Sequence, residues 1–596
     1  MTIFRKAGSL ALLILLSVPF LSIGLVGDRQ NGPSQNRLDE YNAEVPKTIV
    51  QLQLFRQSSS MQIRSKAGRE GIATLTNLNP AINAWYVLEI AWKDQGAPVA
   101  YHLENPEPGA RRLMLDEKRP TGIVIANGGS PAYCDLFEGN TLDQAKASSM
   151  IYYPLCGGQI YLRNAAIGHR TSLEAATEFL REHVWGGESI IALGHILMGE
   201  AHRESAKLEA KPPEARAVQA EPGALPRAAE IDAKYADKIL ASGNLGMVLR
   251  SAPADGMMPG AWYEAADNPG IYVSLLQPNL IDPAILQSYR TAVHNLDGVE
   301  ASSLCYSIAF DLARFDLGYA RGTEHPAVTW SDHMQEKMKD SKLPGPDGIG
   351  NISPLVSTGL IGPEYAGDTV ATFTGGFKRH HGAFKYGDLS LRNHGSHYGF
   401  VENGVIFSKP QPGLATIFVL NDGSIEMRTW TETDQALLAK VKHARQNGVA
   451  LIEFDAAIQS GVPGSLVNLW GAGNWSGSED MKLRTMRSGA AIQRNHGKRF
   501  LIYAVFSDAT PSAMARVFRA YHCDYAMLLD MNALEHTYLA VYRRSGSQIF
   551  VDHLIKGMDV LDRSATGELV PRFLGYADNR DFFYVTRRRA AMEAKP

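Results

Sequence analysis

The stretch FLIYAVFSDATPSAMARVFRAYHCDYAMLLDMN, residues 500–532, decides the fold of the carboxy-terminal half of this chain. Its apolar and aromatic start, Phe500–Phe506, predicts a strand. Thr510 followed by proline is typical of a helix start and predicts a helix over Pro511–Tyr521. A second apolar run then ends at Asp530. The order is strand, helix, strand, with an acid at the end of the second strand.

Asp530 is the first candidate catalytic residue. A carboxylate that closes an apolar run is poorly solvated unless it meets a cation, a metal or hydrogen-bond donors, and Arg487 is a candidate cation. Glu535 and His536 follow as further catalytic candidates, with Asn532 as a substrate-binding candidate. His536 could act as a general acid or base because the ordinary pKa of histidine lies near neutrality. The alternatives are a structural aspartate and a structural histidine.

Thr369–Phe377 predicts a second strand that runs into a Gly-Gly turn. Glycines let the backbone approach a ligand and expose N–H donors, and the basic residues 378–381 would suit an anion. Thr374, Gly375 and Gly376 are therefore substrate-binding candidates. A tight hairpin with solvated charges is the alternative.

These motifs together resemble the phosphodiester glycosidase family, which includes the enzyme that uncovers mannose 6-phosphate. The resemblance covers about Val370 to Arg543 and implies an α+β domain made mainly of strands. It rests on a Thr-Gly-Gly-Phe turn, an arginine before small residues, a Gly-Lys turn and a Leu-Asp strand end, at Thr374–Phe377, Arg487–Ile492, Gly497 and Ala526–Asp530.

The chain departs from this family at two places. Thr374 stands where the family has asparagine, and the glycine-rich loop expected after Asp530 is replaced by Met531, Asn532, Ala533 and Leu534. The resemblance implies an exported envelope hydrolase that acts on a glycosidic phosphodiester or a related glycan linkage. A non-catalytic glycan-binding or polysaccharide-assembly protein with the same fold is the alternative, because fold alone does not fix function.

Other polar clusters carry weaker signals. His394 and His397 lack a convincing third ligand, so we expect no metal site, and the sequence identifies no cofactor. Trp470 and Trp475 could serve a sugar site or pack as anchors. The run 579–583, Asn-Arg-Asp-Phe-Phe, is interpreted as a structural tie for the carboxy terminus.

The remaining sequence predicts an α+β organisation in several parts. We expect a small mixed domain over residues 45–200, with a helix at Ser172–His183, and a linker rich in Ala, Pro and Glu over residues 201–230 that is poorly ordered. A helical lead-in over residues 231–355 follows, with helical patterns at Asp232–Leu249 and Pro283–His294. A strand-rich α+β domain over residues 356–590 comes last. Further strands are predicted at Ala84–Trp92, Gly122–Ile125, Ala415–Leu420, Ala450–Phe454 and Tyr538–Tyr542.

The amino terminus, residues 1–30, predicts export. Arg5 and Lys6 precede the uncharged run Ala7–Val26, whose length matches the ~20 residues that cross a bilayer as a helix. The absence of an Ala-x-Ala site favours an uncleaved inner-membrane anchor, with a cleaved signal peptide as the alternative, and either would place the body in the periplasm or outside the cell.

The net charge limits the classes of partner that we expect, and the cysteine content limits the possible disulfides. The net charge of -3 gives no global basic field, so we expect no nucleic-acid partner. The family resemblance implies a glycan or sugar phosphate as substrate. Four cysteines are present, and an oxidising compartment permits a bond between Cys134 and Cys156, which lie close in turn-rich sequence. Two buried free thiols are the alternative. Whether Cys305 and Cys523 meet is left open.

Overall fold

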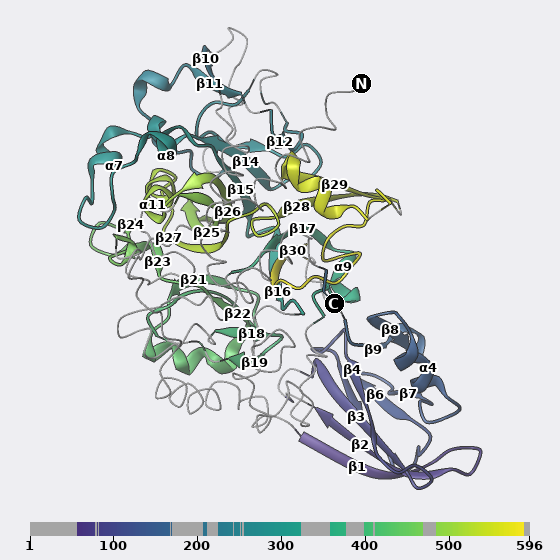
Figure 1. Cartoon of the computed structure of the whole chain (residues 1–596). Helices are drawn as coiled ribbons and strands as arrows, with labels where there is room; N and C mark the ends of the chain where they lie inside the picture. Colours follow the sequence, from purple (N-terminus) through teal and green to yellow (C-terminus); the bar gives the residue numbers. More distant parts are fainter. Residues whose placement is uncertain are drawn as a thin grey trace, which may run out of the picture. The chain divides into compact units, whose positions relative to one another are not determined.

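The computed structural model (Figure 1) describes most of the chain between residues 57 and 588. The described residues are 57–77, 80, 83–166, 168–169, 207–210, 225–241, 243–250, 252, 256–323, 358–376, 399–408, 410, 412–468, 484–546, 548–564 and 566–588. The predicted amino-terminal segment and the predicted helix at Ser172–His183 lie outside them. Among the described residues, no helix has the length and apolar character needed to cross a membrane.

The first part is an antiparallel sheet with its own core. Six strands lie in the order β1-β2-β3-β4-β9-β8: Gln57–Arg64, Glu70–Asn77, Trp85–Trp92, Val99–Glu104, Ile160–Arg163 and Tyr152–Leu155. Side chains alternate along each strand, and one face packs with the short sheet β5-β6-β7 (Arg111–Met114, Ile123–Asn127, Ala132–Cys134) and helix α4 (Thr141–Ala147). The strands predicted at 84–92 and 122–125 are thus confirmed as β3 and β6.

Cys134 and Cys156 form a disulfide, with their Cα atoms 5.6 Å apart. The prediction from their spacing and compartment is confirmed. Cys305 and Cys523 are buried free thiols.

Strands of the second part build three larger sheets. The eight-stranded sheet has the order β13-β14-β15-β26-β25-β27-β23-β24: Tyr263–Glu264, Ile271–Leu276, Cys305–Asp311, Lys498–Ala509, Thr485–Asn495, Tyr525–Met531, Ala450–Asp455 and Ser460–Pro463. The six-stranded sheet has the order β12-β29-β28-β17-β30-β16: Leu245–Gly246, Gln548–Ile555, Leu539–Ser545, Thr369–Thr374, Phe582–Arg587 and Phe315–Ala320. The five-stranded sheet has the order β19-β18-β22-β20-β21: Val405–Ser408, Phe400–Glu402, Val441–Gln446, Ala415–Leu420 and Ile425–Thr429.

The strand, helix, strand unit predicted from residues 500–532 is confirmed as β26, α11 (Pro511–Ala520) and β27. The Thr510 side chain accepts a hydrogen bond from the backbone N–H of Ala513 at 3.3 Å, which caps the helix. Strand β25 pairs antiparallel with both β26 and β27, so these two strands run parallel on either side of it. The helix packs against this sheet (Figure 1) and contacts β23 and β26. The chain therefore crosses over and delivers Asp530 to a buried strand end.

The predicted helical lead-in over residues 231–355 is wrong where the structure describes it. The 232–249 pattern becomes a short 3-10 helix, η2 (Ala233–Tyr235), and the strands β11 (Lys238–Ala241) and β12. The helix predicted from Pro283 ends at Gln287, as α7 (Pro283–Gln287). The region also contains the short helices η3 (Pro278–Leu280) and α8 (Gly298–Ser302). Short helices elsewhere in the described chain are η1 (Cys156–Gly158), α9 (Pro363–Ala366), η6 (Glu432–Lys440) and η8 (Lys556–Asp562). Strands β12, β15 and β16 pair with strands after residue 360, and β13 and β14 extend the same sheet beyond β15. This region is therefore part of the carboxy-terminal sheets.

The predicted linker over residues 201–230 is also corrected in part. Residues Lys207–Ala210 form β10, which pairs antiparallel with β11. The backbone N–H of Arg227 donates to Gln493 Oε1 at 2.7 Å, and that of Glu230 donates to the Ala520 carbonyl at 3.0 Å. The end of the expected linker is therefore bound to the eight-stranded sheet and to the end of α11, because its backbone groups find partners there.

Candidate functional site

Asp530 lies near the end of β27, a strand whose residues are all buried. Its Oδ2 accepts a hydrogen bond from Arg580 Nη1 at 2.5 Å, and its Oδ1 accepts one from the backbone N–H of Met531 at 2.8 Å. Ser488 Oγ donates to the Asp530 carbonyl at 3.0 Å. The cation that a buried carboxylate needs is thus Arg580, which is only 3% exposed.

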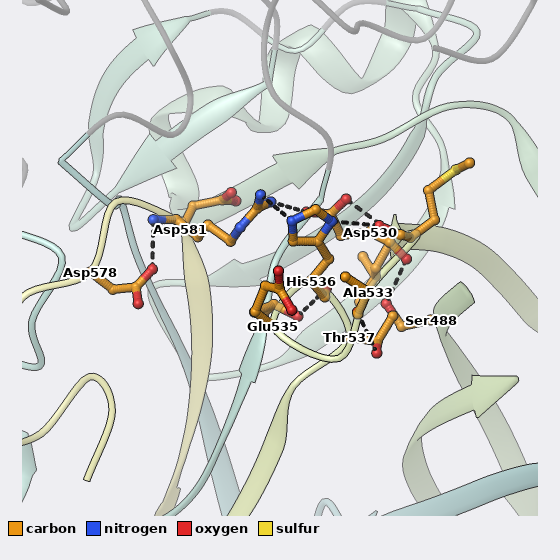
Figure 2. A network of polar contacts seen from close by, with 12 residues as sticks. Ser488, Asp530, Ala533, Glu535, His536, Thr537, Asp578 and Asp581 are labelled. Carbon is orange, nitrogen blue, oxygen red and sulfur yellow. Dashed lines mark hydrogen bonds and ion pairs between the residues drawn. The ribbon is translucent and has the colours of Figure 1, made fainter. Parts of the chain in front are cut away.

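His536 contacts the same guanidinium (Figure 2). Arg580 Nη2 lies 2.6 Å from His536 Nε2, and His536 Nδ1 lies 2.7 Å from the Met531 carbonyl oxygen. A guanidinium only donates and a carbonyl only accepts, so Nε2 is the acceptor and Nδ1 carries the proton. The contacts therefore hold His536 as the neutral Nδ1–H tautomer, and Arg580 joins the two predicted catalytic side chains.

The loop after β27 takes a different form from the expected glycine-rich one. Asn532 adopts a φ of 85°, and its backbone N–H donates to the Met486 carbonyl at 2.8 Å. Glu535 is buried and its carbonyl accepts from Arg572 Nη1 at 2.8 Å. His536 and Asn532 are partly exposed, so this loop forms the accessible edge of the cluster.

Thr374 and the two glycines lie beside this loop. Thr374 Oγ1 donates to the His536 carbonyl at 2.6 Å, and the backbone N–H of Gly375 donates to the Asp581 carbonyl at 2.8 Å. A Cβ at Gly375 would lie 2.2 Å from Asp581 Oδ2, and one at Gly376 would lie 2.7 Å from the Asn447 side chain. The glycines are needed here because the turn packs directly on buried polar side chains.

The segment before β30, residues 578–581, organises the whole cluster. Asp578 accepts two hydrogen bonds from Arg572, at 2.7 and 3.1 Å, and one from the backbone N–H of Arg580 at 2.9 Å. Asp581 Oδ2 accepts from Arg445 Nε at 2.7 Å and from the Tyr319 hydroxyl at 3.1 Å. From the sequence, residues 579–583 were interpreted as a structural tie for the carboxy terminus, and Arg580 was not identified as a site residue. The one available signal was the cluster of charged residues directly before an aromatic strand.

Arg487 does not take the place that the sequence suggested for it. Its Nε donates to the Ala509 carbonyl at 2.7 Å and its Nη1 lies 3.0 Å from Met531 Sδ. Burial lowers the pKa of Arg487 to about 9, although the negative charge of Glu300 acts to raise it. Arg487 therefore supports the ends of β26 and β27 from inside the sheet, and Arg580 is the cation beside Asp530.

A further buried ion pair joins Arg321 and Glu402. Arg321 contacts Glu402, with Nε and Oε2 3.4 Å apart, and the backbone N–H of Arg321 donates to the same oxygen at 3.2 Å. Burial raises the pKa of Glu402 to about 7, although Arg321 and Arg163 act in the opposite direction. Burial also lowers the pKa of Arg321 to about 10.

Glu402 should make stability depend on pH between about 4.5 and 7. Its pKa is higher in the folded than in the unfolded chain, so its contribution is fully present below the unfolded value and is lost as the pH rises through about 7. We expect the contribution of Glu402 to the free energy of unfolding to fall by about 3 kcal/mol over this pH range. Thermal unfolding across this range should show a shallower pH slope in Glu402→Gln than in the wild type. Glu426→Gln, at a partly exposed ion pair, is the control; equal slopes in all three proteins would contradict the assignment.

Among the described residues, no three His, Cys, Asp or Glu side chains gather as metal ligands. His394, His397, Trp470 and Trp475 lie outside the described part of the chain. The structure thus brings together Asp530, Glu535, His536, Thr374 and the two glycines, with Asn532 at the edge.

Comparisons with protein-family models and with curated proteins give no match. Among solved structures, the chain is similar to the catalytic domain of zebrafish N-acetylglucosamine-1-phosphodiester alpha-N-acetylglucosaminidase, with a TM-score of 0.28 and 9% identity over 54% of this chain and 85% of that chain. A Burkholderia pseudomallei protein whose name describes it as exported matches with a TM-score of 0.19 and 10% identity, over 50% of this chain and 76% of its own. At such TM-scores, neither structure decides the fold or the activity of this chain.

Proposed function

We propose that this chain is an exported hydrolase that acts on a glycosidic phosphodiester or a related glycan linkage in the cell envelope. The observation that carries the proposal is the contact set of Asp530, Arg580 and His536 at the end of β27, beside the Thr374-Gly375-Gly376 turn. The sequence resemblance to phosphodiester glycosidases supports the substrate class. The positive residues and apolar run at the amino terminus support export.

Each side chain has a role that its geometry allows. A guanidinium can bind a phosphate oxygen through charge-assisted hydrogen bonds, which assigns substrate binding to Arg580. His536 is neutral and partly exposed, so it can take a proton in the reaction and return it later. Asp530 holds Arg580 in place, and Thr374 fixes the backbone of His536. Glu535 and Asn532 border the same edge.

A three-way substrate panel tests this proposal on the purified full-length chain. The panel contains glycosyl phosphodiesters, glycosides without phosphate, and phosphodiesters without sugar. We expect release of sugar from the first group only. Turnover of plain glycosides alone would remove the phosphate from the proposal, and inactivity on all three groups would overturn the hydrolase assignment.

A non-catalytic glycan-binding protein is the second candidate function. Both Asp530 oxygens already accept hydrogen bonds, and the side chain is only 9% exposed. Such a saturated buried pair also occurs as a purely structural feature. Saturable binding of a glycosyl phosphodiester by calorimetry, without any turnover, would favour this second function over the first.

A further inference from the structure

The Arg580 guanidinium contacts Asp530 and His536, which differ in charge. Nη1 binds the Asp530 carboxylate at 2.5 Å, while Nη2 donates to the uncharged Nε2 of His536 at 2.6 Å. Both hydrogen bonds have the ionised guanidinium as donor, but only the bond to Asp530 also joins opposite charges, which adds Coulomb attraction. An anion placed beside Arg580 therefore competes well for Nη2, whereas it competes poorly for Nη1.

The contact with Arg580 also controls the chemistry of His536. Because Nδ1 donates to the Met531 carbonyl, Nε2 is the nitrogen on which this imidazole can accept a proton. That position is occupied by Nη2 in the present structure. His536 can act as a base only after the guanidinium has turned away from it.

Access to the cluster comes from the side of His536. Arg580 is 3% and Asp530 is 6% exposed, whereas His536 and the preceding Asn532, Ala533 and Leu534 are partly exposed. The backbone N–H of Arg580 is bound to Asp578, so the main chain is fixed and the end of the side chain is what can turn. An anion that enters past His536 meets Nη2 first.

We infer that Arg580 works as an exchange residue: a phosphodiester anion takes its Nη2 from His536 and so frees the imidazole Nε2, while Nη1 stays on Asp530. The inference rests on the proposed function and adds that binding of the substrate phosphate itself activates the base. The exchange makes and breaks hydrogen bonds only, so the protein is covalently unchanged by it. A neutral glycoside would leave His536 blocked.

The imidazole nitrogen signals of His536 test this directly. The full-length chain would be labelled with ¹⁵N-histidine, and His536→Gln would identify the signal by its loss. Dimethyl phosphate is the probe because it carries the diester anion without a sugar; methyl glucoside and sodium chloride at matched ionic strength are controls. We expect a saturable shift of Nε2 towards the position of an unbonded imine nitrogen with dimethyl phosphate only.

Two variants show whether Arg580 causes that shift. In Arg580→Gln the Nε2 signal should start near the unbonded position and stay there on addition of dimethyl phosphate. Arg580→Lys serves the same purpose if the first variant does not fold, since a single ammonium cannot span Asp530 and His536 as the guanidinium does. Arg543→Gln, which breaks an ion pair at a more exposed arginine, should respond like the wild type.

The outcomes separate this inference from the proposed function. An unmoved Nε2 at the solubility limit of dimethyl phosphate, or an equal shift in Arg580→Gln, overturns the exchange. Hydrolysis of a glycosyl phosphodiester without the shift would retain the function and reject the exchange. The shift without hydrolysis of any substrate would retain the exchange as a phosphate-binding device and reject the hydrolase.

Discussion

His536→Gln should lower the turnover of a glycosyl phosphodiester at least a hundredfold while leaving the melting temperature nearly unchanged. General acid–base catalysis by a positioned side chain contributes about 10²–10⁴-fold. Glutamine retains an amide that can bond to Arg580 and the Met531 carbonyl, but it cannot take up a proton in the reaction and return it. Because the side chain is partly exposed, the replacement leaves no large cavity.

A matched control separates loss of a base from loss of any histidine. His522 is likewise partly exposed and contacts a carboxylate, with its Nε2 3.1 Å from Glu230 Oε1. His522→Gln should keep full turnover. If His536→Gln is as active as His522→Gln, then His536 is architectural and the site lies elsewhere.

The local signals of the sequence were sufficient for the units that surround Asp530. The proline after Thr510 and the apolar run before Asp530 are local signals, which depend on only a few neighbouring residues. Both the predicted helix and the predicted strand form at the expected positions. The Gly-Gly turn was also located, although its glycines pack on Asp581 and Asn447. The partners in this packing are far away in the chain, so the sequence around the turn does not reveal them. The turn was therefore interpreted as a binding loop.

The errors arose where partners are distant in sequence. Arg580 lies 50 residues beyond Asp530 and was hidden in a run that looked like a terminal tie. Arg487 was favoured as the cation because it precedes small residues in the family resemblance, yet its guanidinium lies against Ala509 and Met531. Helical periodicity at residues 232–249 was overridden by pairing of β11 with β10, since backbone hydrogen bonds to another strand depend on tertiary structure.

Removal of either partner of the Asp530–Arg580 pair should lower the stability of the protein, which replacement of His536 should not do. Asp530→Asn leaves a buried guanidinium without its carboxylate, which typically costs about 3–5 kcal/mol of stability. We expect a marked fall in melting temperature together with loss of turnover, so the single variant alone cannot distinguish catalysis from folding. Denaturant unfolding and turnover must therefore be measured on the same preparations.

Removing both charges resolves the two effects. In the double variant Asp530→Leu with Arg580→Met, no unpaired charge remains, and exchanging a buried ion pair for apolar side chains is often neutral or stabilising. Stability should return towards that of the wild type, by about 3 kcal/mol relative to Asp530→Asn. Turnover should stay at least a hundredfold down, because neither the phosphate-binding guanidinium nor its anchor is present. Recovery of turnover along with stability would show that the pair serves the fold alone, and that the anion is bound by other residues.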